Sequence, residues 1–175
     1  MKIINTPLNG LKILELEPRT DERGYFVRTF CGDELRVSDL DFKIKQINHS
    51  FTKLTGTLRG MHFQREPKAE GKIVQCLRGK IYDVTLDLRP ESSTYLKWFP
   101  VELSEGKQIL FYIPKGFAHG LQTLTDNCLV QYFMSETYSP EHVAGVRWDD
   151  PALAIKWPIA KPILAEKDKN WPLLI

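Results

Sequence analysis

The stretch Ile81–Leu88, which reads IYDVTLDL, alternates apolar and polar side chains residue by residue. Successive side chains of a β-strand point to opposite faces, so this period of two predicts a strand with one buried face and one solvated face. The turn signal Arg78-Gly79 precedes the stretch and Arg89-Pro90 follows it. Glycine and proline end regular structure at such places, so the sequence predicts a well-bounded strand here.

The same kind of stretch recurs along the chain on both sides of this strand. Short strands separated by turn residues are typical of antiparallel sandwiches, barrels and jelly rolls, so we predict an all-β fold. Two short stretches favour helix, residues 33–36 and the region after residues 139–142, and the absence of linkers and repeats predicts a single domain over residues 1–175. The further predicted strands are Leu11–Glu17, Tyr25–Phe30, Lys72–Leu77, Trp98–Leu103, Gln108–Ile113 and Leu129–Met134.

Composition argues against several classes of protein. Hydrophobic residues make up 42% of the chain and charged residues 26%, as in globular proteins. The net charge of +2 comes from scattered basic residues, which argues against nucleic-acid binding. No apolar run approaches the roughly 18 residues that a membrane span needs. The polar start Met1–Asn5 is unlike a signal peptide, so we predict a cytoplasmic protein with no membrane or nucleic-acid partner.

The three cysteines are Cys31, Cys76 and Cys128. An odd number without close spacing argues against a disulfide framework and against a zinc knuckle. Their apolar neighbours predict reduced thiols that serve as small core residues.

The segment Thr57–Gln64, TLRGMHFQ, places a histidine in an extended stretch. Strand alternation puts His62 and Gln64 on one face and Arg59 with Met61 on the other. If the His62 face lines the barrel interior, its neutral imidazole is well suited to take a proton from carbon. The alternative is a hydrogen-bonded core histidine, and this segment alone leaves both open.

Two more polar side chains interrupt apolar stretches. Lys72 opens the stretch KIVQCL, where an unpaired ammonium is costly, so it is either a solvated strand start or faces an anion. Tyr132 lies in LVQYFM and is either a half-buried structural tyrosine or a proton donor.

The segment Ile113–Gly120, IPKGFAHG, is a tight turn from which His119 re-enters a strand. It resembles the second motif of cupins, where the histidine often binds a metal. The first cupin motif normally offers His-x-His followed by Glu, but residues 62–64 read His-Phe-Gln. Two imidazoles without a third protein ligand make a poor catalytic metal site, so we predict no metal.

Together these motifs closely resemble the dTDP-4-dehydrorhamnose 3,5-epimerase family. The resemblance runs from DERG at residues 21–24 to EKD at residues 166–168, and the order and spacing of its motifs make it specific. The resemblance implies a cupin-type jelly-roll barrel, a homodimer with an exchanged strand, and a nucleotide-sugar substrate, namely a nucleotide-linked 4-keto-6-deoxyhexose. Its core is LRGMHFQ (58–64), GK (71–72), DV (83–84), DLR (87–89), PKGFAHG (114–120), Tyr132 and RWDDP (147–151).

The resemblance also implies epimerisation at C3, C5 or both, through an enolate. The ketone at C4 acidifies the protons on C3 and C5, so a base removes one and an acid returns one to the opposite face, with no cofactor. His62 matches the family's base, and Asp168 matches the carboxylate that holds the imidazole. Tyr132 matches the acid on the opposite face.

Further positions match substrate contacts of the family. Arg59 and Lys72 match cationic groups near the keto oxygen and the phosphates, which suits a developing enolate and a diphosphate. Tyr138 matches an aromatic residue that stacks on the nucleotide base. The remaining matches are Arg23, Gln46, Asn48, His119 and Lys167.

Two positions depart from the family pattern. Arg28 and Val143 stand where the family commonly has glutamates that contact the substrate. A guanidinium has only donors, so we predict that Arg28 binds substrate with weaker discrimination for thymine and a tighter hold on the diphosphate. The alternative is that Arg28 points to solvent.

Other functions stay open at this point. One is an epimerase that inverts a single carbon of another nucleotide deoxysugar, such as a CDP-dideoxyhexulose. A second is a metal-dependent cupin oxygenase or isomerase, against which Gln64 argues. A third is a non-catalytic sugar-binding cupin, against which His62, Asp168 and Tyr132 argue together, because binding alone needs no acid and base.

Overall fold

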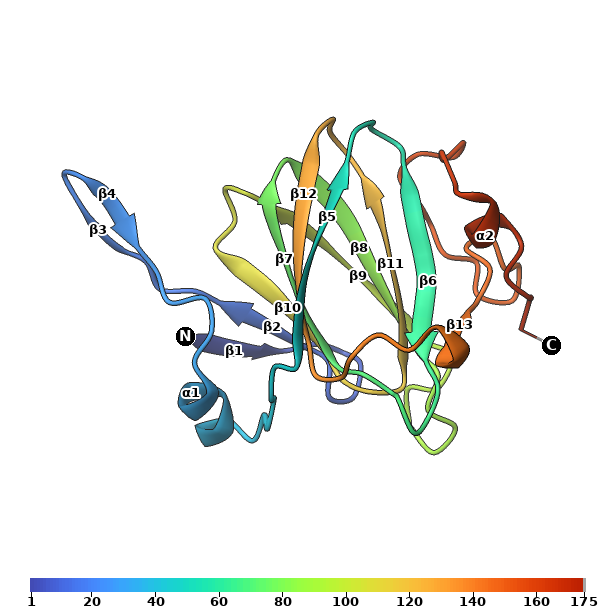
Figure 1. The fold of residues 1–175 in the computed structure, drawn as a ribbon, viewed down its shortest axis with the longest axis horizontal. Helices are drawn as coiled ribbons and strands as arrows, with labels where there is room; N and C mark the ends of the chain where they lie inside the picture. Colours follow the sequence, from blue (N-terminus) through green and yellow to red (C-terminus); the bar gives the residue numbers. More distant parts are fainter. Residues whose placement is uncertain (175) are drawn as a thin grey trace.

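Two antiparallel β-sheets packed face to face form the body of the protein (Figure 1). The computed structural model describes residues 1–174. One sheet has the strand order β1-β2-β10-β7-β12-β5 and the other has the order β13-β6-β11-β8-β9. The first comprises β1 Lys2–Asn5, β2 Lys12–Glu15, β10 Ile109–Ile113, β7 Lys72–Arg78, β12 Cys128–Met134 and β5 Gln46–Thr52. The second comprises β13 Val143–Gly145, β6 Leu58–Gln64, β11 Phe117–Thr123, β8 Lys80–Asp87 and β9 Trp98–Ser104.

Smaller elements surround the two sheets. Strands β3 (Arg19–Asp21) and β4 (Gly24–Phe26) form a hairpin that projects away from the barrel, on the left of Figure 1. Two short helices, α1 (Gly32–Val37) and α2 (Glu166–Lys169), lie at opposite sides of the molecule. A 3₁₀ turn spans residues 140–142, and strand β13 follows it directly, so the predicted helix after residues 139–142 is wrong. The predicted all-β class with short peripheral helices is confirmed.

Most predicted strands are confirmed to within two residues at each end, with one exception. The prediction of one strand over Tyr25–Phe30 is wrong beyond Phe26, because Val27 and Phe30 pack on an apolar cluster instead of pairing with a neighbouring strand. Strand β5 was not predicted. Its apolar side chains face outward and are exposed, so it lacks the usual signal of a half-buried strand.

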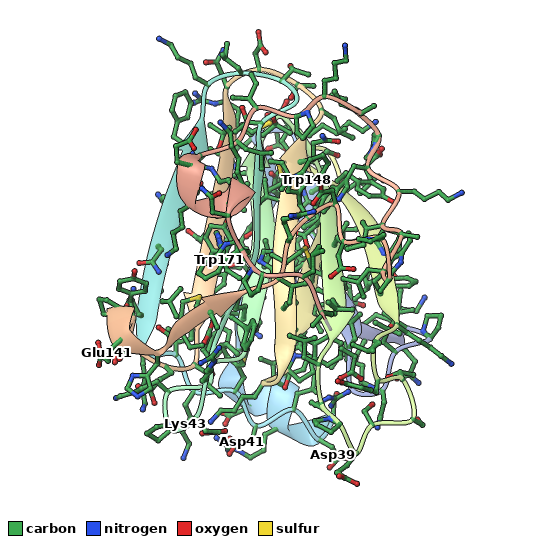
Figure 2. The ribbon with its side chains drawn as sticks, turned by 90° about the vertical axis from the view of Figure 1, so that its right-hand side faces the viewer. Asp39, Asp41, Lys43, Glu141, Trp148 and Trp171 are labelled. Carbon is green, nitrogen blue, oxygen red and sulfur yellow. The ribbon has the colours of Figure 1, made fainter. Side chains whose placement is uncertain are left out.

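Three apolar layers hold the sheets together. The central layer lies between them and includes Val74 and Phe111. Next to these residues in the chain, Ile73 and Leu110 point the other way, into a layer that α1 covers. The third layer lies on the outer face of the second sheet, where the C-terminal segment carrying Trp148 and Trp171 crosses it (Figure 2).

Because both faces of β8 are covered, the predicted solvated face of Ile81–Leu88 is wrong. Its apolar side chains Val84 and Leu86 pack under the C-terminal segment. Its polar side chains Asp83 and Asp87 are fully buried on the opposite side of the strand. The polar face of this strand therefore lines the inside of the barrel, where it can serve a site.

The cysteines are all free, and Cys76 and Cys128 are buried, whereas Cys31 is partly exposed. Burial raises the pKa of the Cys76 thiol to about 12, so it stays protonated. Within residues 1–174, no helix is long and apolar enough to cross a membrane. The cytoplasmic location stays a prediction.

Candidate active site

A cleft opens between the two sheets, with β5, β7 and β12 on one side and β6 and β11 on the other. It consists of two adjoining hollows of about 290 and 320 Å³. They share Asn48, His62, Lys72 and Met134, so they form one continuous cavity. The cavity brings together ten of the twelve predicted site residues: Gln46, Asn48, Arg59, His62, Lys72, His119, Tyr132, Tyr138, Lys167 and Asp168.

An irregularity in β6 determines which of its side chains face the cleft. His62 pairs with His119, whereas Arg59 pairs with Leu121, so β6 uses one residue more than β11 over the same distance. This bulge turns Arg59 and His62 to the same side, and both line the cleft. The prediction from strict alternation, which put them on opposite faces, is wrong for that reason.

His62 and Asp168 form the most closely bonded pair in the cleft. The His62 Nε2 atom lies 2.5 Å from Asp168 Oδ1, and the backbone N–H of Gly60 donates to Asp168 Oδ2 at 3.3 Å. Burial by itself would raise the pKa of Asp168, but the hydrogen bond and charge of His62 outweigh burial, and the pKa lies below its usual value. Asp168 is therefore an anion that holds the imidazole.

Tyr132 reaches the cleft from β12, on the sheet opposite His62. Its ring meets the His119 ring edge-on, with 6.2 Å between centroids. Burial and the nearby charge of Asp83 raise the pKa of the phenol, against smaller opposing effects of Ser50 and Arg59. The hydroxyl thus keeps its proton at neutral pH and has one to donate.

His119 forms a second imidazole–carboxylate pair, with Asp83 of β8. The Nε2 atom of His119 lies 2.8 and 2.9 Å from the two carboxylate oxygens, and both residues are buried. Burial raises the pKa of Asp83, while the charges of His119 and Lys72 oppose that rise. Sequence reasoning gave Asp83 no role, because its alternation pointed it to solvent.

Glu70 is another residue that sequence reasoning missed. Lys72 is only 8% exposed, and its ammonium lies 3.0 Å from a Glu70 oxygen. The other Glu70 oxygen accepts the backbone N–H of Gln64 at 3.0 Å. A buried ammonium needs a partner, so the predicted anion-facing position of Lys72 was itself the signal for a nearby carboxylate.

The nucleotide-sugar contacts expected at the cleft rim are linked by hydrogen bonds. Gln46 donates through its amide to Asn48 Oδ1 at 2.9 Å and accepts the backbone N–H of Tyr138 at 3.0 Å. Arg59 Nε donates to the Thr52 hydroxyl at 3.0 Å. These bonds fix polar side chains on both walls and leave the exposed Tyr138 ring free to stack.

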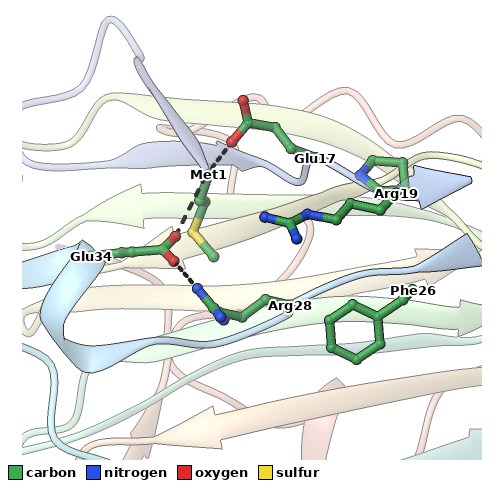
Figure 3. A pocket seen from close by; sticks show the side chains of 7 residues that line it. Met1, Glu17, Arg19, Phe26, Arg28 and Glu34 are labelled. Carbon is green, nitrogen blue, oxygen red and sulfur yellow. Dashed lines mark hydrogen bonds and ion pairs between the residues drawn. The ribbon is translucent and has the colours of Figure 1, made fainter.

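Arg23 and Arg28 lie outside this cleft within one chain. Arg23 is at the tip of the projecting hairpin, where it pairs with Asp21 at 2.6 Å. Arg28 pairs with Glu34 at 2.5 Å in a separate hollow of about 400 Å³, which Phe26 also lines (Figure 3). Within one chain, Arg28 therefore points to the carboxylate of Glu34.

The residues do not fit the metal site of cupins. The Gln64 amide donates to the carbonyls of Lys68 and Thr137, and its oxygen accepts the backbone N–H of Ser139. Gln64 is thus occupied by the backbone. In the described part of the chain, no three His, Cys, Asp or Glu residues stand close enough to hold a metal ion.

The cleft therefore combines His62 of one sheet, paired with Asp168 of α2, with the partly buried phenol of Tyr132 on the other sheet. Such a pair can accept a proton, and the phenol can return one from the opposite side. Fold and site together define a cupin-type epimerase.

A family model for dTDP-4-dehydrorhamnose 3,5-epimerase matches residues 5–175, and the chain belongs to this family. A relative of that name from Methanothermobacter thermautotrophicus is 46% identical over 173 residues, covering 97% of this chain and 92% of the relative. The crystal structure of dTDP-4-dehydrorhamnose 3,5-epimerase from Bacillus anthracis, with TDP and pyrophosphate bound, has a TM-score of 0.96 at 41% identity and covers 99% of both chains.

A third comparison concerns a sugar-bound structure. The epimerase from Legionella pneumophila, in complex with dTDP-4-keto-L-rhamnose, has a TM-score of 0.92 at 36% identity and covers 98% of this chain and 92% of that chain. The predicted family, the cupin-type jelly roll and the epimerase class are thereby confirmed.

Proposed function

We propose that this chain epimerises a dTDP-linked 4-keto-6-deoxyhexose at C3 and C5, converting dTDP-4-dehydro-6-deoxy-D-glucose to dTDP-4-dehydro-L-rhamnose. The observation that carries the proposal is the His62–Asp168 pair facing Tyr132 across one cleft. The names and ligands of the relatives support the substrate class. The proposal extends to residues 1–175 acting as one domain in the cytoplasm.

The reaction begins with proton removal by His62. Because its Nε2 is bonded to Asp168, its Nδ1 is the nitrogen left to accept a proton from C3 or C5. The electrons of the broken C–H bond form the C=C bond of an enolate, and the negative charge moves to the oxygen on C4. Asp168 stabilises the imidazolium that forms.

Cationic groups and the phenol complete the reaction. The Lys72 ammonium lies on the cleft wall and stabilises the enolate oxygen, which carries more charge than the ketone did. Tyr132 then donates its proton to the carbon from the opposite face, and the configuration is inverted. The proton on His62 and the one missing from Tyr132 are exchanged with solvent.

We further propose that two copies pair through the hairpin and β5. Tyr25 and Phe26 on the hairpin are 61% and 71% exposed, and Ile47 and Phe51 on the edge strand β5 are 54% and 52% exposed. A projecting hairpin and an uncovered edge with apolar side chains are features that proteins normally cover. A partner there would bring the hairpin arginines to a second cleft by strand exchange.

Light scattering tests the pairing. The wild type should have twice the mass of the chain, whereas Phe51→Glu should shift it toward the monomer and lower activity. Leu54→Glu, which replaces a similarly exposed side chain outside β5, is the matched control. A monomeric wild type would refute the pairing and leave the catalytic proposal standing.

NMR in deuterated water tests the reaction itself. The enzyme is incubated with dTDP-4-keto-6-deoxyglucose and, separately, with the CDP sugar, and deuterium is scored at C3 and C5. Uptake with inversion at both carbons of the dTDP sugar is the expected result. Uptake at one carbon, or only with the CDP sugar, would favour the narrower epimerase. No uptake with tight binding would favour a sugar-binding protein.

A further inference from the structure

Trp171 lies on the chain segment that follows α2 (Figure 2), where it contacts both His62 and Asp168. Its indole N–H donates to Asp168 Oδ1 at 3.3 Å, the same oxygen that bonds His62. Its ring meets the imidazole of His62 edge-on, with 5.9 Å between centroids and 69° between planes. One side chain thus touches both members of the pair without lining the cleft.

The surroundings leave the indole little freedom to move. A Cβ atom added at Gly145 would lie 2.3 Å from the indole ring, so the ring rests directly on the backbone of β13. Gly145 is itself the residue that pairs with His62 across the sheet. On the other side, the Lys167 ammonium lies 5.2 Å from the ring centre, within range of a cation–π contact.

A tether of this kind is needed because α2 has only four residues. So short a helix has little stability of its own, and its orientation depends on the contacts it makes. Asp168 must nevertheless hold its carboxylate 2.5 Å from His62. A misplacement of about 1 Å at a catalytic group can cost about 100-fold in rate.

We propose that Trp171 is a positioning residue that fixes Asp168 and His62 relative to each other and so sets the orientation of the base. The expected effect on the rate rests on the proposed function. Trp171 acts through the His62–Asp168 pair and does not contact the substrate. The N–H orients the carboxylate, and the ring edge limits rotation of the imidazole.

The test uses two variants and one control. Trp171→Phe keeps a ring and removes the N–H, whereas Trp171→Leu removes both. The control is Trp157→Phe. It removes an indole N–H that donates to the Trp148 carbonyl at 2.9 Å, from a tryptophan outside the cleft. For deuterium uptake we expect kcat to fall about 3- to 10-fold in Trp171→Phe and about 10- to 100-fold in Trp171→Leu. KM should stay within about twofold, and the control should match wild type.

A second readout needs no turnover. The ring proton of His62 that bonds to Asp168 resonates far downfield in proton NMR, and this signal should move or broaden in Trp171→Phe but not in Trp157→Phe. Unchanged kcat and an unmoved signal in Trp171→Phe would overturn the proposal, as would equal losses in the control. If wild type exchanges no deuterium, the proposed function fails, and the NMR signal alone decides whether Trp171 positions the pair.

Discussion

The bond between His62 and Asp168 joins residues 106 positions apart in the chain, and it decides what the imidazole can do. An isolated imidazole exchanges protons at either nitrogen. Here the carboxylate occupies Nε2, and only Nδ1 is left for the substrate. The remaining groups of the cleft then differ in charge and protonation because their surroundings differ, as the raised pKa of Tyr132 and the lowered pKa of Asp168 show.

Replacing His62 with asparagine should nearly abolish deuterium uptake at every carbon that exchanges. General base catalysis is worth about 10²- to 10⁴-fold, and His62 is the base that the proposal assigns to both carbons. Asp168→Asn should weaken the same step and leave substrate affinity nearly intact. A His62→Asn enzyme that keeps more than about a tenth of wild-type uptake would contradict the assignment.

Tyr132→Phe should separate proton removal from inversion. His62 still removes the proton, because it acts from the other sheet, so deuterium uptake should persist. Net epimerisation should fall, because the enolate is reprotonated by water or from the side on which it lost its proton. NMR of the sugar measures both rates in one sample. Equal losses of uptake and epimerisation would mean that Tyr132 is structural.

At the scale of single elements, the bulge in β6 determines which of its side chains line the cleft. It depends on Gly60, which has a φ of +128° and lies so close to the neighbouring strand β11 that a Cβ atom would be 2.5 Å from the Gly120 Cα. Only glycine fits this conformation and this spacing. The residue that carries no side chain therefore decides where Arg59 and His62 point.

Gly60→Ala should lower the free energy of unfolding by more than about 2 kcal/mol and reduce activity further than stability alone explains, because β6 must shift. Gly106→Ala is the matched control, since nothing lies within 4 Å of its added Cβ. Urea unfolding of both variants measures the difference. Equal stability of the two would show that β6 and β11 can separate without cost.

On the scale of the whole molecule, buried charge links stability to pH. Asp87 accepts hydrogen bonds from Arg89, Ser92 and Thr94 where β8 leads into β9. Burial alone would raise the pKa of Asp87, but these donors outweigh burial and lower it to about 2. In the unfolded chain the pKa is about 3.9, so the unfolded state binds the proton first as the pH falls.

This difference should contribute about 2.6 kcal/mol of stability above pH 4, and that contribution should be lost as the pH falls from about 4 to about 2. Asp87→Asn should be less stable at neutral pH and show a shallower loss in this window. Unfolding in urea at a series of pH values measures both. An unchanged pH dependence in Asp87→Asn would show that the donors do not favour the carboxylate.

Arg28 also belongs to this scale, because under the proposed pairing it would reach the cleft of a second copy. Glu34, its partner at 2.5 Å, neutralises part of its charge. We expect Arg28→Glu combined with Val143→Glu to shift kcat/KM toward dTDP over non-dTDP sugars by at least about tenfold, or about 1.4 kcal/mol. Steady-state kinetics with dTDP and CDP substrates measures the ratio. An unchanged ratio would show that these two positions do not select the nucleotide.

Much of the fold was present in the sequence as local pattern. Alternation bounded by turn residues predicted β7, β8, β9, β10 and β12, because the period of a strand is a property of neighbouring residues. The motifs around His62, Lys72, His119 and Tyr132 predicted most of the cleft, since the family resemblance carries their joint arrangement with it.

Only the tertiary structure decided which face of each strand is inside. Local alternation marks two faces but not what covers them, and α1 and the C-terminal segment cover faces that the sequence leaves undetermined. Asp83 turned inward for that reason, and Arg59 joined His62 because a bulge added one residue to β6. The roles of Glu70 and Trp171 were not predicted from the sequence for a related reason. Their roles consist of contacts across space, and such contacts leave no period in the chain.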